Sequence, residues 1–228
     1  MERILDVFER QKPGDRSMHK KLAIIANGTI TDDAFHKKIL GNVDMIICAD
    51  GGANHAYALG VIPEYIVGDF DSITAQVLSY FIEQKKTTLV KDTNPDKTDV
   101  ELALSLAQSL NPQEIVLLGA LGCRMDHTLA NMLCLTKLPS AIKAQIIDET
   151  NTIELVDKPV DITGKENDIV SVVPLTDVAG LSYKGMKWPV TNKKTTVGWF
   201  GISNRLLQNT ATIALAKGKL LVIRVRKE

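Results

Sequence analysis

Six aspartates that follow predicted β-strands are the residues of this sequence best placed to do chemistry. Each comes just after a short apolar segment, within ADGG, GDFDS, NPDKTD or CRMDH. The six are Asp50, Asp69, Asp71, Asp96, Asp99 and Asp126. Because the carboxyl ends of parallel strands form one edge of a sheet, we expect these carboxylates to gather there.

Carboxylates gathered on one edge would repel one another, and some would have to take up protons. A divalent cation removes this conflict, and oxygen ligands without His or Cys suit Mg²⁺, which shares its ligand shell with substrate phosphates. Lys97 and Arg124 lie in the same loops, and the fork of Arg124 can contact two phosphate oxygens at once. Gly51 and Gly52 permit close approach of the backbone. These residues predict a site for a magnesium-bound phosphate ester.

Simpler interpretations exist for single residues. One aspartate after a strand more often caps a helix or forms a turn. Ser72 and Thr98 are expected to cap two of the helices, so capping does not account for their aspartate neighbours. His127 is equally compatible with a catalytic base and with a structural residue at a helix start. The sequence contains neither a Walker motif nor G-x-G-x-x-G, which disfavours P-loop and dinucleotide-binding proteins.

The elements that must position these residues alternate between short apolar segments and amphipathic ones. Continuous apolar runs suit strands that are buried on both faces of a parallel sheet. Helices are expected after Ser72, after Thr98 with Glu101 as its capping-box partner, and from about His127 to Pro139. The predicted strands cover residues 22–26, 45–49, 65–68, 87–90, 115–119 and 145–148.

After Asn151 the pattern changes to short β-rich segments separated by turn residues, with no room for a helix of ordinary length. This pattern favours an antiparallel sandwich or barrel. The β-rich segments are TIELV, DIVSVVPL, TIALA and KLLVIRVRK. We therefore predict an α/β fold: an N-terminal parallel-sheet α/β domain over residues 21–149, followed by a small antiparallel β-sandwich domain over residues 150–228. Residues 1–20 are predicted to be an N-terminal extension, with a short amphipathic helix and a Pro13-Gly14 turn.

Composition disfavours several other classes of protein. The 228 residues include 27 basic and 27 acidic side chains, so the chain lacks the positive excess of a nucleic-acid binder. No apolar run approaches the roughly 20 residues that span a bilayer, and the first residues lack the apolar region of a secretory signal. Three cysteines without a CxxC pair favour a reducing compartment. We expect a cytoplasmic protein without nucleic-acid or membrane partners.

The ordered segments ADGGAN, GDFDS, DKTDVELAL, RMDH, KW and SN resemble the thiamine pyrophosphokinase (thiamin diphosphokinase) family. The matching segments lie between residues 49 and 204, so they involve both predicted domains. The resemblance implies an enzyme that transfers pyrophosphate from ATP to the hydroxyl of thiamine with Mg²⁺, giving thiamine diphosphate and AMP. It also implies a homodimer with thiamine bound at the subunit interface.

The resemblance further implies roles for individual residues. The metal-binding carboxylates would be Asp69, Asp71 and Asp99. The catalytic set would be Asp71, Asp99, Arg124 and Asp126, and the nucleotide would also meet Asp50, Gly51, Gly52, Asp96, Lys97 and Thr98. One departure is Cys123, which stands where many relatives have a second glycine. A side chain fits there if the backbone φ is negative.

Thiamine would be bound by Trp188, Ser203, Asn204 and Asp126. Its thiazolium ring carries a permanent positive charge, and an indole face attracts such a cation. Trp199 is the rival to Trp188, and either indole alone is more often part of a core. Gly201 and Ile202 differ from the small polar residues expected beside Ser203.

The expected chemistry is in-line attack of the thiamine hydroxyl on the β-phosphorus of ATP, promoted mainly by positioning and charge neutralisation. The proton acceptor stays open between Asp126 and a metal-bound carboxylate. One alternative is transfer to a different hydroxymethyl heterocycle, such as a pterin. Another is a non-catalytic nucleotide or thiamine sensor, for which so many carboxylates are not required.

Overall fold

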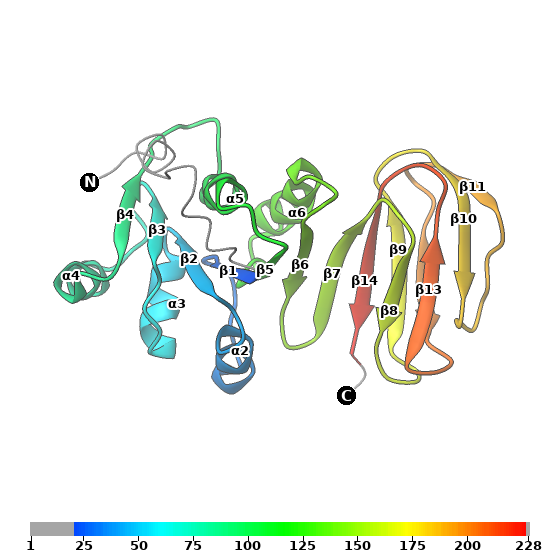
Figure 1. Cartoon of the computed structure of the whole chain (residues 1–228), viewed down its shortest axis with the longest axis horizontal. Coiled ribbons are helices and arrows are strands. Elements are labelled where there is room, and N and C mark those ends of the chain that lie inside the picture. The colour runs from blue at the N-terminus through cyan, green and yellow to red at the C-terminus, as the bar shows by residue number, and fades with distance from the viewer. Residues whose placement is uncertain (1–20, 227–228) are drawn as a thin grey trace. The chain divides into compact units, whose positions relative to one another are not determined.

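The structure is a computed structural model that describes residues 21–226, and the chain divides into two compact units between Glu149 and Thr150. The first unit contains a parallel sheet with helices, and the second contains antiparallel strands (Figure 1). The helix and turn predicted within residues 1–20 lie outside the described residues.

The sheet of the first unit has the strand order β6-β5-β1-β2-β3-β4, and every pair of neighbours is parallel. The chain runs outward from β1 to β4 and then returns to the other side of β1, so the strand order reverses between β1 and β5. In open parallel sheets, ligands bind beyond the carboxyl ends of the strands at such a reversal. The strands are β1 (Lys21–Ile25), β2 (Met45–Ala49), β3 (Tyr65–Gly68), β4 (Thr88–Lys91), β5 (Glu114–Leu118) and β6 (Lys143–Ile147).

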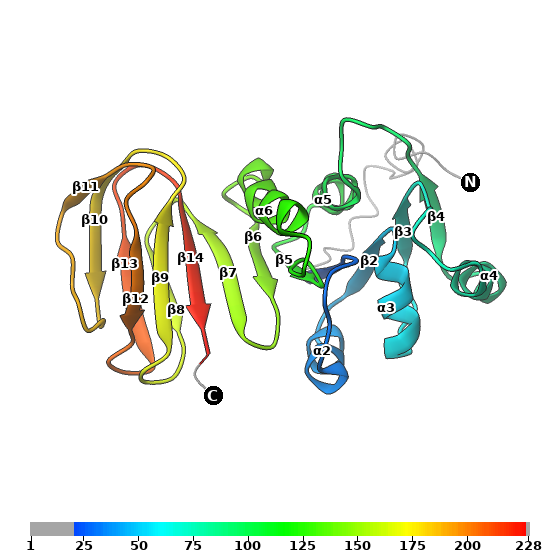
Figure 2. The same cartoon turned by 180° about the vertical axis from the view of Figure 1, so that it is seen from behind.

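Helices cover both faces of this sheet. Helices α2, α3 and α4 lie on one face, and α5 and α6 lie on the other (Figures 1 and 2). A short 3-10 helix, η1 (Leu135–Lys137), continues α6. The helices are α2 (Asp33–Leu40), α3 (Gly52–Leu59), α4 (Ala75–Gln84), α5 (Asp99–Ser109) and α6 (Met125–Cys134).

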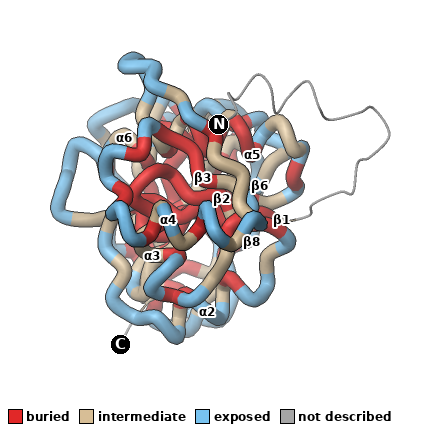
Figure 3. The backbone as a smooth tube through the Cα atoms, turned by 90° about the vertical axis from the view of Figure 1, so that its left-hand side faces the viewer, coloured by how far each residue is buried: buried red, intermediate tan, exposed pale blue. Residues whose placement is uncertain are grey.

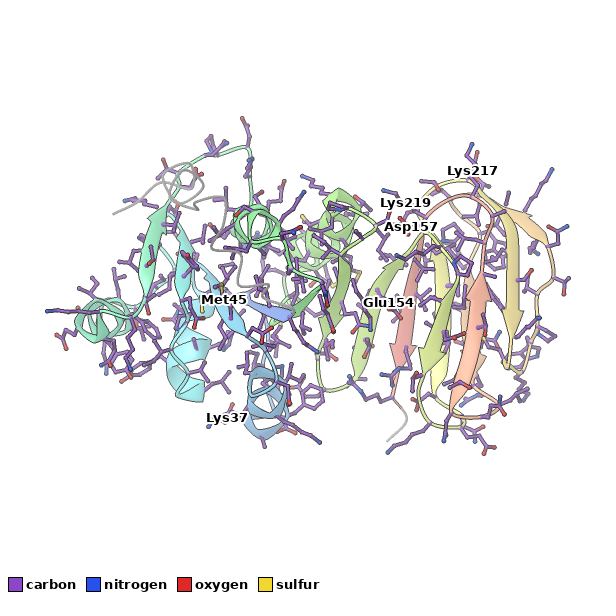
Figure 4. All side chains as sticks on the ribbon, viewed as in Figure 1. Lys37, Met45, Glu154, Asp157, Lys217 and Lys219 are labelled. Carbon is purple, nitrogen blue, oxygen red and sulfur yellow. The ribbon has the colours of Figure 1, made fainter. Side chains whose placement is uncertain are left out.

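The core of the first unit explains the continuous apolar runs of the sequence. With helices on both faces, successive residues of a strand are buried alternately against each layer, and Leu22, Ala23, Ile24 and Ile25 of β1 are all inaccessible to solvent. Buried strands lie beneath exposed outer loops (Figure 3). Figure 4 labels both situations: Met45 is buried at the start of β2, whereas Lys37 is exposed on α2.

Two helix starts test the predicted capping residues. Thr98 caps α5 in a capping box with Glu101, as predicted. The prediction for Ser72 was wrong, because α4 is capped by Thr74, whose hydroxyl accepts from the amide of Val77. Because the helix is capped two positions later, Ser72 remains in the loop that carries Asp69 and Asp71.

The second unit consists of two antiparallel sheets that enclose one apolar core. The sheets have the orders β12-β9-β14-β7 and β11-β10-β13-β8. Buried side chains from both sheets meet between them, including Val170, Leu181, Ile213 and Val222. The strands are β7 (Asn151–Val156), β8 (Val160–Thr163), β9 (Ile169–Pro174), β10 (Val178–Lys184), β11 (Lys193–Thr195), β12 (Gly201–Arg205), β13 (Thr210–Ala214) and β14 (Leu220–Val225).

The predicted fold class is therefore confirmed: a parallel α/β unit is followed by an antiparallel β-sandwich. Four strands of the sandwich were not predicted, namely β8, β10, β11 and β12, which are short or interrupted by Gly, Ser and Asn. No helix within residues 21–226 combines the length and the apolar character needed to cross a bilayer.

Candidate active site

A cavity of about 440 Å³ opens at the carboxyl ends of β1, β2 and β5 in the first unit. This is the edge at which the strand order reverses, so the fold itself places a ligand site there. The volume lies within the range of small-molecule pockets. The lining residues include Asn27, Gly28, Thr29, Asp50, Ser72, Thr98, Asp99, Gly119, Gly122, Cys123, Arg124, His127, Thr128 and Asn131.

One side of the cavity carries Asp50 and Asp99, and Asp69 and Asp71 lie beside Asp50 without lining the cavity. Asp50, Asp69 and Asp71 each offer an oxygen, and the three oxygens lie within 4.8 Å of one another. Asp50 follows β2 in a left-handed conformation, with φ of 42°. Asp69 and Asp71 follow β3 and are exposed. Oxygen donors at this spacing are a suitable ligand set for one hard divalent cation.

Asp99 lies beside this cluster because Gly68 lets two loops approach. Gly68 has φ of 146°, and a Cβ added there would lie 2.9 Å from both the Cβ of Asp50 and the Oδ1 of Asp99. A larger residue at this position would therefore separate Asp99 from the other carboxylates. Of the predicted metal ligands, Asp69 and Asp71 thus lie within 4.8 Å of Asp50, and Asp99 lies beside these three carboxylates.

The electrostatics of the cluster show a shortage of positive charge. Burial raises the pKa of Asp50, and its Oδ1 is buried without a hydrogen-bond partner among the described residues. Its Oδ2 accepts from the amide of Ser72 at 3.2 Å, and hydrogen bonds from Ser72 and Gly51 offset only part of this rise in pKa. Burial, and then the charges of Asp50, Asp69 and Asp71, raise the pKa of Asp99 to about 6. A bound cation would satisfy this orphaned oxygen and relieve the repulsion, so the donor set fits a divalent metal ion.

The opposite side of the cavity is built from two glycine-containing loops that follow β1 and β5. The amide of Gly28 donates to the carbonyl of Gly119 at 2.6 Å, and the amide of Thr29 donates to the carbonyl of Leu121 at 2.8 Å. A Cβ on Gly28 would lie 2.3 Å from both carbonyl oxygens, so only glycine allows this approach. The loops thereby form a closely packed wall.

Helix α6 holds this wall from behind. The hydroxyl of Thr128 accepts from the amide of Gly122 at 3.1 Å, and the amide group of Asn131 donates to the carbonyl of Ala120 at 2.8 Å. Both side chains are buried. Cys123 is not among the residues with positive φ, so the backbone there accommodates a side chain where many relatives are expected to have glycine.

Arg124 supplies a cation at the rim of the cavity. Its Nε and an Nη donate to the two carboxylate oxygens of Asp126, at 3.0 and 2.6 Å. These bonds hold the pKa of Asp126 well below its usual range. Arg124 lines the cavity, whereas Asp126 does not and faces Arg124 instead.

The remaining predicted nucleotide residues divide into two groups. Thr98 lines the cavity, but Asp96 and Lys97 are exposed in the turn before α5 and are not among its lining residues. Gly51 and Gly52 pack against the loop after β1. A Cβ on Gly52 would lie 1.9 Å from the carbonyl oxygen of Ile25, and one on Gly51 would lie 2.3 Å from the side chain of Asn27.

The loop after β1 contributes Asn27, Gly28 and Thr29 to the cavity and was not among the predicted site residues. Asn131 on α6 was not among them either. The segment NGT after the apolar run LAIIA was a usable signal. It becomes informative only once β1 is known to lie next to β5, where the strand order reverses.

In the second unit, Trp188 and Trp199 differ in exposure. Trp188 has 53% of its surface exposed, whereas Trp199 is partly buried against the sandwich core. The ammonium of Lys187 lies 4.8 Å from the centre of the Trp188 ring, so that indole face already attracts a cation.

Asn204 fixes the backbone of Trp188. Its Oδ1 accepts from the amide of Trp188 at 3.1 Å, and its Nδ2 donates to the carbonyl of Trp188 at 2.7 Å. Asn204 is buried. Ser203 is exposed, has φ of 62°, and donates its amide to the hydroxyl of Ser171. Of these three predicted residues, Trp188 and Ser203 are therefore exposed, and the buried Asn204 is hydrogen-bonded to Trp188.

Two family models match the two units of the chain in order. Residues 36–147 match the model described as thiamin pyrophosphokinase, catalytic domain, and residues 151–220 match the model described as thiamin pyrophosphokinase, vitamin B1 binding domain.

Individual proteins with the same family name are similar over most of the chain. A thiamine pyrophosphokinase of Bacillus subtilis is 35% identical over 183 residues, which cover 78% of this chain and 86% of that protein. Thiamine pyrophosphokinase 1 of Arabidopsis thaliana is 26% identical over 79% of this chain and 78% of its own length. The crystal structure of the Bacillus subtilis protein superposes with a TM-score of 0.82 at 30% identity, covering 92% of this chain and all of that one.

Proposed function

The chain belongs to the thiamine pyrophosphokinase family, and we propose that it transfers the pyrophosphate of ATP to the hydroxyl of thiamine, with AMP as the second product. Formation of thiamine diphosphate by pyrophosphate transfer is the activity of that family. One observation carries the finer proposal: the oxygens of Asp69 and Asp71 converge on Asp50, which lines the same cavity as Arg124.

Magnesium would be held by Asp69 and Asp71 together with Asp50 and Asp99. When bound, Mg²⁺ neutralises phosphate charge and orients the transferred group. The residues around it have separate tasks. Arg124 would donate the Nη N–H groups that do not bind Asp126 to phosphate oxygens, and the Gly28–Gly119 wall would exclude water from one side of the cavity.

Asp126 is a weak candidate for the proton acceptor. Its two hydrogen bonds to Arg124 lower its pKa, and a carboxylate of low pKa accepts a proton poorly. Asp126 instead holds the Arg124 fork in one orientation. Catalysis would then depend on alignment of the hydroxyl with the β-phosphorus and on stabilisation of developing charge.

Thiamine would stack its thiazolium ring on Trp188. Support comes from the exposure of this indole, since a lysine ammonium lies over the ring of both Trp188 and Trp199. Asn204 would fix the Trp188 backbone, and Ser203 would offer a hydrogen bond to the aminopyrimidine. As the resemblance implies, thiamine would bind between two copies of the chain, a state that light scattering of the purified protein tests directly.

The decisive experiment incubates the protein with thiamine and ATP, with and without Mg²⁺, and separates the products by chromatography. We expect thiamine diphosphate and AMP in equal amounts, and neither product without a divalent cation. Thiamine monophosphate with ADP would overturn pyrophosphate transfer. Turnover of a hydroxymethyl pterin instead of thiamine would assign another acceptor, and binding without AMP release would indicate a sensor.

A further inference from the structure

Two consecutive residues of α3 hydrogen-bond to the two opposite sides of the candidate active site. Asn54 donates its amide to the carbonyl of Ser72 at 2.9 Å, and its Oδ1 accepts from the amide of Thr74 at 3.1 Å. The Nε2 of His55 lies 2.7 Å from the carbonyl oxygen of Gly28. Asn54 thus binds the loop of Asp69 and Asp71, while His55 binds the glycine wall of the cavity.

Neither side chain is needed for α3 itself. The N-cap of α3 is Gly51, which makes no side-chain capping bond. Asn54 and His55 are in the first turn, where side chains often bond to free amides of their own helix. Here both reach out of the helix to carbonyls and an amide of other loops, at sequence separations of 18, 20 and 27 residues.

Two glycines let the first turn of α3 lie close to the end of β1 and the loop that follows it. Gly52 lies against the end of β1, where any Cβ would lie 1.9 Å from the carbonyl oxygen of Ile25. Gly51 lies similarly against Asn27. The helix start therefore sits directly on the β1 loop, which brings His55 within reach of Gly28.

The acidic loop needs external support. Asp69 and Asp71 are exposed, carry like charges and have oxygens within 4.8 Å of one another and of Asp50. Repulsion between them favours an opened loop. Among the described residues, two side chains hydrogen-bond this loop to the start of α3. Asn54 bonds to Ser72 and Thr74, and Asp50, two residues before the helix, accepts from the amide of Ser72.

We propose that Asn54 and His55 are positioning residues. They set the spacing between the carboxylates of Asp50, Asp69 and Asp71 and the Gly28–Gly119 wall. This role rests on the function proposed above. Asn54 acts through Asp69 and Asp71, and its loss weakens the hold on the metal ion. His55 acts through Gly28, and its loss loosens the wall that the nucleotide meets.

The test measures metal and nucleotide separately in the full-length protein. Mn²⁺ is used as a spectroscopic substitute for Mg²⁺, and its binding is followed by electron paramagnetic resonance without any turnover. We expect Asn54→Ala to weaken Mn²⁺ binding about tenfold, the effect typical of residues that orient metal ligands. His55→Ala is expected to leave Mn²⁺ binding within about twofold and to raise the KM for ATP about tenfold. His55→Gln, whose amide can still donate to the Gly28 carbonyl, is expected to recover most of that loss.

Asn42→Ala is the matched control, because Asn42 makes the same kind of amide-to-carbonyl bond, to Lys38 at 2.7 Å, far from the cavity. The inference is overturned if Asn54→Ala and His55→Ala behave like Asn42→Ala, or if both variants lose affinity for metal and nucleotide equally, in proportion to a fall in Tm.

Asp71→Asn distinguishes a failure of the positioning role from a failure of the metal site. If Asp71→Asn abolishes Mn²⁺ binding while Asn54→Ala does not change it, the metal site stands and the positioning role fails. If Asp71→Asn has no effect either, the metal site itself is wrong, and the positioning role is overturned with it.

Discussion

Carboxylates at two places in the first unit differ in the number of donors around them. At the carboxyl edge of the sheet, burial raises the pKa of Asp50 and that of Asp99, the latter to about 6. At the end of the unit, burial alone would raise the pKa of Glu149, but hydrogen bonds from backbone amides, including those of Thr31 and Asp32, lower it to about 2.

The difference separates a carboxylate with a structural role from those that we propose bind a metal ion. One oxygen of Glu149 accepts from the amide and hydroxyl of Thr31 and the amide of Asp32, at 2.7 to 2.9 Å. It therefore fixes the start of α2 and needs no further cation. The buried Oδ1 of Asp50 has no partner among the described residues. A carboxylate left short of donors in this way is stabilised by a ligand that brings positive charge.

The largest effect on activity should come from removing one negative charge from the cluster of Asp50, Asp69 and Asp71, which has few hydrogen-bond donors. We expect Asp71→Asn to lower kcat at least about 100-fold, because the amide keeps the size of the side chain but no longer balances a divalent cation. Steady-state production of AMP over a range of Mg²⁺ concentrations measures this, and excess Mg²⁺ should restore part of the rate.

Asp33→Asn is the control for Asp71→Asn, since Asp33 is exposed in the first turn of α2. Its activity should match that of the wild type. Equal activity of Asp71→Asn and Asp33→Asn at every Mg²⁺ concentration would show that donor shortage does not mark the functional carboxylates.

The next effect concerns the cation at the rim of the cavity. We expect Arg124→Ala to lower kcat/KM for ATP about 100-fold and Arg124→Lys about tenfold, because lysine keeps the charge but loses the planar fork. Lys37→Ala, which removes an exposed cation from α2, should leave kcat/KM unchanged. Full activity of Arg124→Lys would mean that charge alone matters and that the bidentate pair with Asp126 orients nothing.

Much of this site followed from strand ends in the sequence. Apolar runs locate β2 and β3 to the residue, so the aspartates after them are predicted to share one edge without any knowledge of strand order. The start of α4 is harder to predict, because Ser72 and Thr74 are both competent caps and only the path of the loop decides between them.

Other features depend on contacts between distant segments. The β1 loop joins the site because β1 pairs with both β2 and β5, and a local pattern does not encode that arrangement. The role of Glu149 is likewise invisible in sequence, since its donors at residues 31 and 32 lie over 110 positions away. Asp96 is exposed in its turn and does not line the cavity, so its contact with the nucleotide stays a prediction.

A smaller effect should appear in stability when the donor-rich carboxylate is neutralised. The pKa of Glu149 is about 2 in the folded protein, against an ordinary value of 4.5, so its contribution to stability is fully present above pH 4.5 and is lost as pH falls towards 2. We expect Glu149→Gln to lower the free energy of unfolding at pH 7 by about 1–2 kcal/mol, allowing for its partial exposure.

Urea unfolding at several pH values measures this prediction. The wild type should lose stability between pH 4.5 and 2 more steeply than Glu149→Gln, and the two proteins should converge at the acid end. Glu83→Gln, at an exposed position of α4, is the control. A constant difference between wild type and Glu149→Gln at all pH values would mean that shape, and not charge, is what the three donors recognise.

The smallest effect should come from removing one of the few donors that the acidic cluster does have. The hydroxyl of Ser72 donates to Oδ1 of Asp71 at 2.8 Å, and such an exposed bond contributes about 0.5–1 kcal/mol, or a two- to fivefold change in binding. We expect Ser72→Ala to weaken Mn²⁺ binding by that factor, because the hydroxyl orients the carboxylate more than it competes with the cation. Ser72→Thr keeps the donor and should bind Mn²⁺ as the wild type does. Tighter binding by Ser72→Ala would reverse this conclusion, since it would show that each donor supplied by the protein reduces the attraction of the cluster for a metal ion.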